Sequence, residues 1–453
     1  MSAIARILAD RGMDVSGSDA KGSHVLTGLA VRGVYTAVGH RAENLDLIEG
    51  GPTAVVVSTA IRPDNPEVLE AHRRHLPVVR RAVALAALMR GRRSVCVAGT
   101  HGKTSTTSML TVALQHAGLD PSFAIGGELN ESGSGAHHGS GDIFVAEADE
   151  SDGSFLAFTP HGAIIMNLEP DHLDHHGTAE AYAAVFDQFV DRIEPGGFLV
   201  ACTDDPGIVA LLERVRSGPG APRIVSYGRD PDADIRLGPS TSEGHRTSAG
   251  VTLPDGSTVQ LRLAVPGEHM LLNATGAMAA GLLLGVDRQA MVDGLASYTG
   301  VRRRFEYKGR AAGISVYDDY AHHPTEITVQ LQTARTVAPV GGRLIAVFQP
   351  HLYSRTRTFA DAFAEALGAA DIVVVLDVYG AREDPEPGVT GALIADKITG
   401  ATVLFEPSFG AAPHTIAGLA HPGDLVIFMG AGDVTMLAPQ LLDQLADTSG
   451  ESM

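Results

Sequence analysis

Short runs of apolar residues alternate along the chain with segments whose apolar residues recur every three or four positions. The runs are rich in Val, Ile and Leu and have the length of buried β-strands, whereas the segments between them have helical periodicity. This alternation predicts an α/β fold, with parallel sheets covered by helices on both faces. The clearest strand candidates are residues 54–57, 94–97, 143–146, 163–166, 314–317, 344–348, 372–376 and 425–429.

The chain of 453 residues has room for about three domains. We expect a first domain over residues 1–91, a central domain over residues 92–300 and a third domain over residues 301–453. Within the central domain, residues 218–263 are rich in Gly, Pro, Ser and Asp and alternate only weakly. That composition predicts an antiparallel or irregular subregion.

The first domain begins in an unusual way. Residues 1–9 have the pattern of a helix, because Ile4, Ile7 and Leu8 share one face, and a short strand is expected at residues 14–16. These elements form the second half of a βαβ unit, so we expect the first strand and the Gly-rich loop of that unit to be missing from this sequence. Either the start codon is placed too late or the unit is incomplete.

A candidate phosphate-binding loop lies between the strand at residues 94–97 and a helix-period segment at residues 106–117. Residues 98–105 spell Ala-Gly-Thr-His-Gly-Lys-Thr-Ser. In such a loop, backbone N–H groups and the helix N-terminus surround phosphate oxygens, the lysine reaches the β- and γ-phosphates and the hydroxyl reaches Mg²⁺. Lys103 and Thr104 are these candidates. A chance glycine turn before a helix is the alternative, since the strict pattern has Gly where this chain has Val97.

Polar clusters begin where two further strands of the central domain stop. Residues 147–152 (Glu-Ala-Asp-Glu-Ser-Asp) follow one strand and residues 167–174 follow the next. Because the carboxyl ends of parallel strands share one edge, both clusters should meet the phosphate loop there. Glu147 is the candidate Mg²⁺ ligand. His172 would be an unusual ligand for a hard cation. For Asp149, Glu150 and Asp152, a solvated acidic turn is slightly favoured.

The third domain carries a second polar set. Residues 318–324 (Asp-Asp-Tyr-Ala-His-His-Pro) and residues 349–357 (Gln-Pro-His-Leu-Tyr-Ser-Arg-Thr-Arg) each follow a strand and mix His, Tyr and charged groups, as a site for a polar substrate would. A pair of polar helix-capping loops is the alternative. Residues 302–304, three arginines, form either a solvated run or a phosphate contact. Residues 267–274 either lie beside a nucleotide base or form a helix N-terminus with a buried Asn.

Charge and cysteine content narrow the class of protein. The formal net charge of −19 leaves no broad basic surface and argues against a nucleic-acid partner or an anionic membrane surface. Two cysteines give no disulfide framework, and Cys96 falls in a buried-type strand, where it is expected to belong to the core. No apolar run approaches the ~20 residues of a membrane span and no signal peptide is visible. We therefore expect a cytoplasmic protein without membrane insertion.

Taken together, these blocks resemble the Mur ligase family. The phosphate loop, the two acidic clusters and both third-domain segments occur in the family's order and spacing, from the first residue almost to the last. The resemblance implies an N-terminal Rossmann-like domain for a UDP-sugar, a central P-loop ATPase-like domain for ATP and a C-terminal Rossmann-like domain for an amino acid. It also implies ATP-dependent joining of L-alanine to the lactyl carboxylate of UDP-N-acetylmuramate, through an acyl phosphate, in peptidoglycan precursor synthesis.

The resemblance further implies residue roles on the ATP side. Thr104, Glu147 and His172 would bind Mg²⁺. His269 and Asn273 would lie beside the adenine, and Arg304 would contact the nucleotide. The residues expected to surround the phosphates are Gly99, Thr100, His101, Gly102, Lys103, Thr104 and Ser105.

Substrate-side roles follow from the same resemblance. Tyr320 and His323 would hold the reacting carboxylate and alanine. The candidates for the UDP moiety are Ser18, Asp19, Ser58 and Arg62. The residues expected to take part in catalysis are Lys103, Glu147, His172, His322 and Arg355.

Two departures from the family pattern concern the site. Many relatives have Arg in the position of Leu352, so carboxylate binding should depend more on Arg355 or Arg357. Several related ligases use a carbamylated lysine as a Mg²⁺ bridge, but this chain has no Lys between Lys103 and Lys308.

Alternative functions remain open at this stage. A recycling ligase would join a whole peptide to the same nucleotide sugar. A nucleotide-sugar sensor would bind without turnover, and a phosphate-loop switch would hydrolyse nucleotide without an acceptor. A monomer and a homodimer are both compatible with the sequence.

Overall fold

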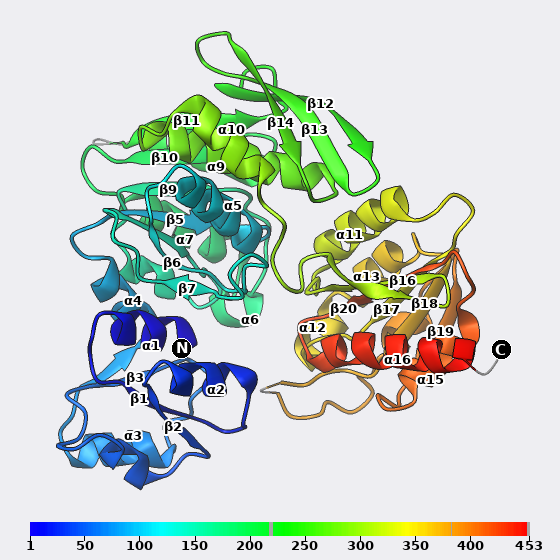
Figure 1. Ribbon diagram of the computed structural model, residues 1–453, viewed down its shortest axis with the longest axis horizontal. Helices are drawn as coiled ribbons and strands as arrows, with labels where there is room; N and C mark the ends of the chain where they lie inside the picture. The colour runs from blue at the N-terminus through cyan, green and yellow to red at the C-terminus, as the bar shows by residue number, and fades with distance from the viewer. Residues whose placement is uncertain (217–220, 382, 451–453) are drawn as a thin grey trace. The chain divides into compact units, whose positions relative to one another are not determined.

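The computed structural model describes residues 1–216, 221–381 and 383–450 (Figure 1). The chain packs into two compact units. The first unit holds residues 1–238, 250–261 and 272–298, and the second holds residues 239–249, 262–271 and the chain from residue 299 onward. The expected domain boundaries after residues 91 and 300 therefore stay predictions, although each expected domain contains β-sheet structure of its own.

The beginning of the first unit contains two small parallel sheets, β1 with β2 and β3 with β4. Helix α1 (Ser2–Asp10) confirms the first expected helix, with Ile4 and Ile7 buried. The strand expected at residues 14–16 begins later in the structure, as β1 (Ser16–Asp19). The other elements are α2 (His24–Val31), β2 (Tyr35–Val38), η1 (Ala42–Asp46), β3 (Val55–Val57), α3 (Pro66–Arg73), β4 (Val78–Arg80) and α4 (Arg81–Met89).

A ten-stranded sheet forms the centre of the molecule's first unit, in the order β14-β13-β12-β11-β10-β9-β5-β8-β6-β7. From β12 to β8 the paired neighbours run parallel, as does β6 with β8, and β7 pairs antiparallel with β6. The strands are β5 (Arg93–Ala98), β6 (Ser122–Ala124), β7 (Ala136–His137), β8 (Ile143–Glu147), β9 (Gly162–Ile165), β10 (Phe198–Cys202), β11 (Arg223–Gly228), β12 (Ile235–Glu243), β13 (Arg246–Thr252) and β14 (Thr258–Leu263).

The helices associated with these strands confirm the expected alternation. The weakly patterned subregion contains β11 to β14, and its residues 218–220 lie outside the described part of the chain. The helices are α5 (Lys103–His116), η2 (Ser154–Ala157), α6 (Leu173–His176), α7 (Ala179–Val190), α8 (Pro206–Arg216), α9 (Glu268–Leu283) and α10 (Arg288–Ala296).

Strand register brings three polar loops to one edge of this sheet. Val97 of β5 pairs with Glu147 of β8, and Ala98 of β5 pairs with Ile165 of β9. The chain leaves all three strands at this carboxyl edge, as expected for an open parallel sheet. Cys96 is fully buried in β5, which confirms its core role.

Helix α5 is buried although its first half is rich in Ser and Thr. The hydroxyls of Thr107, Ser108 and Thr111 each donate to the backbone carbonyl four residues earlier, at 2.6–2.8 Å. These bonds satisfy the hydroxyls inside the fold, where an unpaired polar group is costly. The helix can therefore pack against the sheet, with its N-terminus at the edge where the polar loops lie.

The second unit is built on a six-stranded sheet in the order β15-β16-β20-β17-β18-β19. β15 is antiparallel to β16, and the other neighbouring strands are parallel. Its strands are β15 (Glu306–Ala311), β16 (Ile314–Asp319), β17 (Leu344–Phe348), β18 (Ile372–Leu376), β19 (Thr402–Glu406) and β20 (Leu425–Met429). Its helices are α11 (Pro324–Val337), α12 (Tyr353–Thr358), α13 (Ala360–Leu367), α14 (Ala392–Ala395), α15 (Ala412–Leu419), η3 (Asp433–Met436) and α16 (Leu437–Gly450).

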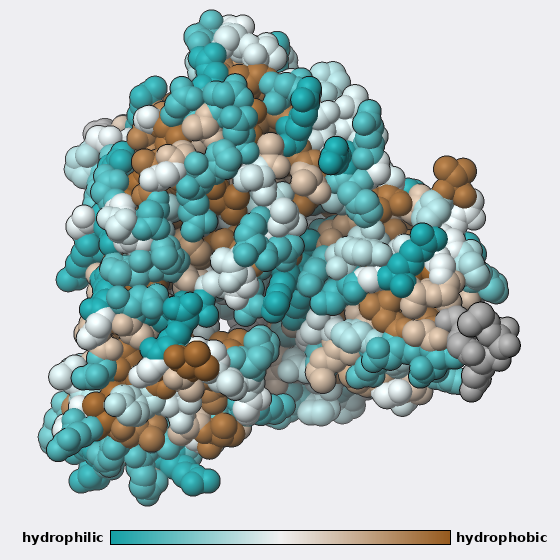
Figure 2. Space-filling model, viewed as in Figure 1, coloured by the Kyte–Doolittle hydropathy of each residue, from teal (hydrophilic) through white to brown (hydrophobic). Residues whose placement is uncertain are grey.

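Within the described ranges, no helix has both the length and the apolar character that a bilayer span requires. On the face drawn in Figure 2, hydrophobic residues are interspersed among hydrophilic ones.

Candidate functional site

The turn between β5 and α5 depends on two glycines with positive φ. Gly99 has φ +132° and Gly102 has φ +81°, and both conformations favour glycine. There is also no room for a side chain. A Cβ on Gly99 would lie 3.1 Å from the backbone N of Asn167, and a Cβ on Gly102 would lie 2.5 Å from Cε of Met166. The sequence thus produces a tight loop that leads directly into α5, with Gly102 as the helix N-cap.

Asn167, the second residue after β9, fixes this loop. Its side-chain Oδ1 accepts a bond from the backbone N of His101 at 2.8 Å, and its Nδ2 donates to the carbonyl of His101 at 3.1 Å. Its backbone carbonyl accepts a further bond from Thr100 N at 3.3 Å. Asn167 therefore acts as a two-sided clamp on the phosphate loop.

Lys103 is held by a fully buried carboxylate. Its Nζ lies 2.9 Å from both side-chain oxygens of Glu150 and donates to the carbonyls of Gly99 at 2.7 Å and Thr100 at 3.2 Å. Burial acts to lower the pKa of Lys103, but the charges of Glu150 and Asp149 outweigh it and raise this pKa. The lysine is therefore a fixed cation at the start of α5.

The slightly favoured interpretation of the acidic cluster as a solvated turn is wrong for Glu150. This side chain has no exposed surface, because the segment after β8 folds back over Lys103. The interpretation fits the two aspartates better. Asp149 is partly exposed, lies 3.6 Å from Arg81 and accepts a bond from Ser151 N. Asp152 accepts one from the backbone N of Ser154.

Thr104 and Glu147 form an oxygen-rich pair next to the lysine. The Thr104 hydroxyl lies 3.0 and 3.1 Å from the two Glu147 carboxylate oxygens. The backbone N of Gly126 donates to Glu147 Oε2 at 2.8 Å, and a Cβ on Gly126 would lie 2.7 Å from that atom. Oxygen ligands of this kind suit Mg²⁺, so these two residues fit a divalent cation.

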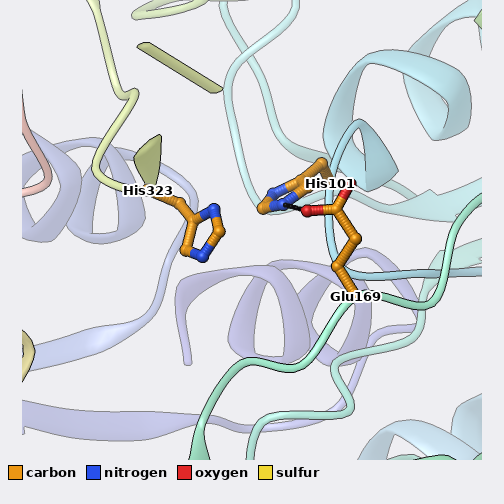
Figure 3. Close-up of side chains that lie close together, drawn as sticks. All are labelled: His101, Glu169 and His323. Carbon is orange, nitrogen blue, oxygen red and sulfur yellow. Dashed lines mark ion pairs between the residues drawn. The ribbon is translucent and has the colours of Figure 1, made fainter. Parts of the chain in front are cut away.

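A network of polar contacts connects the phosphate loop to neighbouring segments. The Thr100 hydroxyl contacts the backbone carbonyl and N of Glu169 and the hydroxyl of Tyr182, each at 3.0 Å. The Tyr182 hydroxyl in turn lies 3.4 Å from Glu150 Oε1. His101 Nε2 lies 3.5 Å from Glu169 Oε2, the ion pair that is dashed in Figure 3. The loop is consequently tied to the segments after both β8 and β9.

His172 lies on a turn just before α6. Its φ is +52°, its backbone N donates to Asp171 Oδ1 at 2.7 Å and its Nε2 lies 3.5 Å from Asp171 Oδ2. Among the described residues, the acidic and imidazole groups that could share one metal ion do not include both Glu147 and His172. Its role as a metal ligand stays a prediction.

The two adenine-side candidates lie on α9. Asn273 is largely buried and close to the phosphate loop, because a Cβ on Gly102 would lie 3.2 Å from its Oδ1. Burial lowers the pKa of His269 to about 4, so this imidazole is neutral at pH 7. The interpretation as a helix N-terminus with a buried Asn is also correct as a description of the fold.

The first-domain candidates fall at strand ends and a turn. Ser18, in β1, donates to Glu67 Oε2 at 2.8 Å and contacts His40 Nδ1 at 3.0 Å. Asp19 ends β1 and is exposed. The remaining two begin two successive turns after β3. The carbonyl of Ser58 accepts from Ile61 N, and the carbonyl of Arg62 accepts from Asn65 N.

In the second unit, the arginine run is not simply solvated. Arg303 donates to the carbonyls of Gly430 at 2.7 Å and Gly432 at 3.1 Å, just after β20. Its guanidinium carbon and that of Arg304 lie 4.8 and 5.1 Å from the ring centroid of Tyr320, a distance typical of cation–π contact. The solvated alternative is therefore wrong for these two residues.

Two aspartates expected in a polar loop are instead the buried end of β16. Asp318 and Asp319 have no exposed surface, and Asp319 accepts bonds from the backbone N of Phe305 at 2.6 Å and of Ala321 at 2.7 Å. Burial raises the pKa of Asp319 to about 7. These acids shape the turn that follows rather than face solvent.

The remaining third-domain candidates surround this turn and the start of α12. The His322 ring contacts the carbonyl of Tyr320 at 3.0 Å and its centroid lies 6.1 Å from that of His351. His323 is buried, with its ring 5.2 Å from Phe359. Arg355 is buried in α12, the helix that Leu352 caps with φ +68°.

Comparison with known proteins finds matches along nearly the whole chain. The Mur ligase family catalytic domain matches residues 1–93, the Mur ligase middle domain residues 97–281, and the glutamate ligase domain of Mur ligases residues 303–432. A UDP-N-acetylmuramate–L-alanine ligase of Saccharopolyspora erythraea is 60% identical over 99% of this chain and 92% of its own. The chain belongs to the Mur ligase family. It is accordingly an enzyme of the ligase class.

Other relatives agree with this assignment. A UDP-N-acetylmuramate–L-alanine ligase of Rhodococcus erythropolis is 52% identical over 98% of this chain and 94% of its own. The crystal structure of a UDP-N-acetylmuramate–alanine ligase from Thermotoga maritima superposes with a TM-score of 0.82, at 28% identity, and covers 99% of this Mur ligase and 97% of its own chain. The crystal structure of a murein peptide ligase from Psychrobacter arcticus superposes with a TM-score of 0.72, at 25% identity. The match covers 99% of this chain and 96% of that ligase. The expected three-part α/β fold is confirmed.

Sequence reasoning missed three residues of this site. The role of Glu150 carried no signal beyond its place in an acidic run. Gly126 is the first of a Gly-Gly pair after β6, a pattern that marks a close backbone approach. Tyr182 lies within a helix with an ordinary amphipathic pattern, and only the fold brings it to Thr100.

Proposed function

We propose that this Mur ligase joins L-alanine to the lactyl carboxylate of UDP-N-acetylmuramate at the expense of ATP, in the synthesis of peptidoglycan precursors. The observation that carries the proposal is the grouping of Lys103, Thr104 and Glu147 at the carboxyl edge of β5 and β8. The names of the relatives support the choice of substrates. ATP and a nucleotide sugar are cytoplasmic metabolites, so the reaction belongs in the cytoplasm.

The phosphate loop suits the triphosphate of ATP. The N-terminus of α5 carries a partial positive charge and Lys103 adds a full one, so both favour phosphate oxygens. Thr104 and Glu147 would hold Mg²⁺, with His172 as a third candidate ligand. The ion would supply positive charge to the phosphates during transfer. Asn273, beside the loop, and His269 are assigned to the adenine side, and Arg304 to a further nucleotide contact.

The chemistry explains why cation-binding groups gather here. A carboxylate is a poor electrophile, so its oxygen first attacks the γ-phosphorus of ATP and ADP leaves. The acyl phosphate that forms is then attacked by the neutral amine of L-alanine, and the tetrahedral intermediate collapses to the amide with release of phosphate. Two anions must approach each other in the first step, and fixed positive charge is what lowers that barrier.

The second unit offers groups for the amino acid. Tyr320, His322 and His323 are assigned to the reacting carboxylate and alanine, and Arg355 to the alanine carboxylate, which an arginine can bind through two parallel bonds. In the first unit, Asp19 ends a parallel strand, where an acid can accept bonds from ribose hydroxyls. Ser18, Ser58 and Arg62 complete the set assigned to the UDP moiety.

The decisive test is phosphate release from ATP. Release should depend on both UDP-N-acetylmuramate and L-alanine, and the product should gain the mass of one alanine residue. Phosphate release without an acceptor would indicate a nucleotide switch, and substrate binding without turnover would indicate a sensor. A peptide-recycling ligase would prefer L-alanyl-γ-D-glutamyl-diaminopimelate over L-alanine, so the two acceptors should be compared at equal concentration.

Arg355 and Arg357 provide a matched pair for the amino-acid assignment. Arg355 is buried in α12, whereas the exposed Arg357 forms an ion pair with Glu386. We expect Arg355→Lys to raise the KM for L-alanine about tenfold or more, because a point charge cannot reproduce two-bond recognition of a carboxylate. Arg357→Lys should leave this KM within about twofold, since an exposed ion pair contributes little. Equal effects of the two variants would contradict the assignment.

Gly102 provides a test of the loop itself. Gly102→Ala should lower nucleotide affinity about tenfold, because the new Cβ adds a clash with Met166 to the ~1–2 kcal/mol cost of a left-handed Ala. Gly118→Ala is the control, since Gly118 has φ +77° but a Cβ there would have open space around it. Both variants should lose thermal stability, but only Gly102→Ala should bind ATP more weakly in calorimetry. Equal affinities would show that the loop geometry does not matter for the nucleotide.

A further inference from the structure

The ammonium of Lys103 has two anionic partners in this enzyme. In the structure it lies 2.9 Å from both oxygens of Glu150. In the proposed function it contacts the β- and γ-phosphates of ATP. A single ammonium has three donors, and two of them already point to the carbonyls of Gly99 and Thr100. The carboxylate and the phosphates therefore draw on the same remaining donor.

Glu150 is a buried residue whose side chain and backbone are held by neighbouring groups. It has no exposed surface, its backbone carbonyl contacts His176 Nε2 at 3.0 Å, and Tyr182 OH lies 3.4 Å from its Oε1. The charged and titratable groups that face it are Lys103, Asp149, Tyr182 and His176. Lys103 is the cation among these groups, so the pair is a single buried salt bridge whose partners depend on each other.

We propose that Glu150 is a positioning residue that holds the Lys103 ammonium at the phosphate loop and competes with the nucleotide for it. The proposal rests on the proposed function, since it assumes that Lys103 binds phosphate. Glu150 takes no part in bond making. It prevents the lysine from adopting other rotamers, and it lowers the affinity for phosphates by placing a negative charge beside them.

This competition predicts a change in the protonation of Glu150 when the nucleotide binds. When the ammonium turns toward the phosphates, the Glu150 carboxylate is left buried without its cation. Burial already raises the pKa of Glu150 to about 7, with Lys103 as the opposing influence. Weakening that contact favours the protonated acid further. Binding of one nucleotide should therefore be accompanied by uptake of a proton from solvent at Glu150 Oε.

The test is the affinity of the full-length enzyme for ATP with Mg²⁺, with Glu150→Gln as the variant. Gln keeps the size and an acceptor oxygen but carries no charge. We expect the Kd for ATP to fall about tenfold, because one negative charge close to the phosphates is removed. Loss of a residue that only supports the fold would leave the Kd unchanged or raise it. An unchanged or higher Kd in a folded variant, with normal binding by the wild type, overturns the inference and leaves the proposed function intact.

Asp142→Asn is the matched control. Asp142 directly precedes β8, at the other end of the strand from Glu150, and forms an ion pair with Arg93 at 2.8 Å. Its removal changes the net charge by the same amount, so the Kd for ATP should stay within about twofold. Failure of the wild type to bind ATP would instead refute the proposed function, and the inference with it.

Two further readouts separate positioning from general support of the fold. Calorimetry in two buffers of different ionisation enthalpy should show more proton uptake per bound ATP for the wild type than for Glu150→Gln. Thermal unfolding should show that Lys103→Met is less stable than Lys103→Met/Glu150→Gln, because the double variant has no unpaired buried carboxylate. Equal proton uptake, or additive losses of stability, would contradict the competition.

Discussion

Lys103→Met is expected to lower the rate of amide formation by about a thousandfold or more, as loss of a charge-stabilising group at a phosphoryl-transfer site typically does. The methionine keeps much of the aliphatic length of the side chain but has no ammonium. The full positive charge of the ammonium then no longer helps to offset the repulsion between the lactyl carboxylate and the γ-phosphate as they approach. Phosphate release that depends on both UDP-N-acetylmuramate and L-alanine is the measurement, with circular dichroism to confirm that the variant folds.

The control for this variant is Lys397→Met. Lys397 is an exposed lysine that forms an ion pair with Asp361 on the surface of the second unit. It should retain the wild-type rate within about twofold, because exposed pairs contribute ~0–1 kcal/mol. If Lys103→Met turned over at the wild-type rate, the phosphate loop would have no part in the reaction.

The fold was largely predictable because its strands are buried on both faces. β17, β18 and β20 are continuous apolar runs, and their bounds coincide with the predicted residues. The residue at which α5 begins was harder to predict. Its first residues are Lys, Thr and Ser, which have no apolar periodicity, and the helix begins there because Gly102 supplies the left-handed N-cap. The predicted helix therefore began three residues too late, at residue 106.

Parts of the site could not be predicted because they depend on contacts between distant segments. The position of Thr104 and Glu147 followed from the rule that parallel strands end at one edge. No local pattern, however, distinguishes the buried Glu150 from its partly exposed neighbour Asp149. The difference arises because the turn after β8 lies over Lys103, 47 residues earlier in the chain. Likewise, cation–π contact with Tyr320, rather than hydration, sets the environment of Arg303.

Glu147→Gln is expected to lower kcat about a hundredfold and to raise the Mg²⁺ concentration needed for half-maximal rate. Glu147 is an oxygen ligand that Thr104 and the backbone N of Gly126 already orient. The amide keeps one oxygen but has no charge, and hard divalent cations bind neutral oxygens more weakly than carboxylates. A magnesium titration of the phosphate-release rate measures both quantities.

Two companion variants separate the charge of Glu147 from its placement. Gly126→Ala leaves the carboxylate charged but would place a Cβ 2.7 Å from its Oε2, so the carboxylate must move. We therefore expect Gly126→Ala to raise the Mg²⁺ requirement less than Glu147→Gln and to recover its rate at high Mg²⁺. Asp152→Asn removes a charge from the same acidic segment, where Asp152 accepts a bond from the backbone N of Ser154, and should leave the titration unchanged. If Asp152→Asn and Glu147→Gln shifted the titration equally, the segment would act through its total charge, and Glu147 would not be a specific ligand.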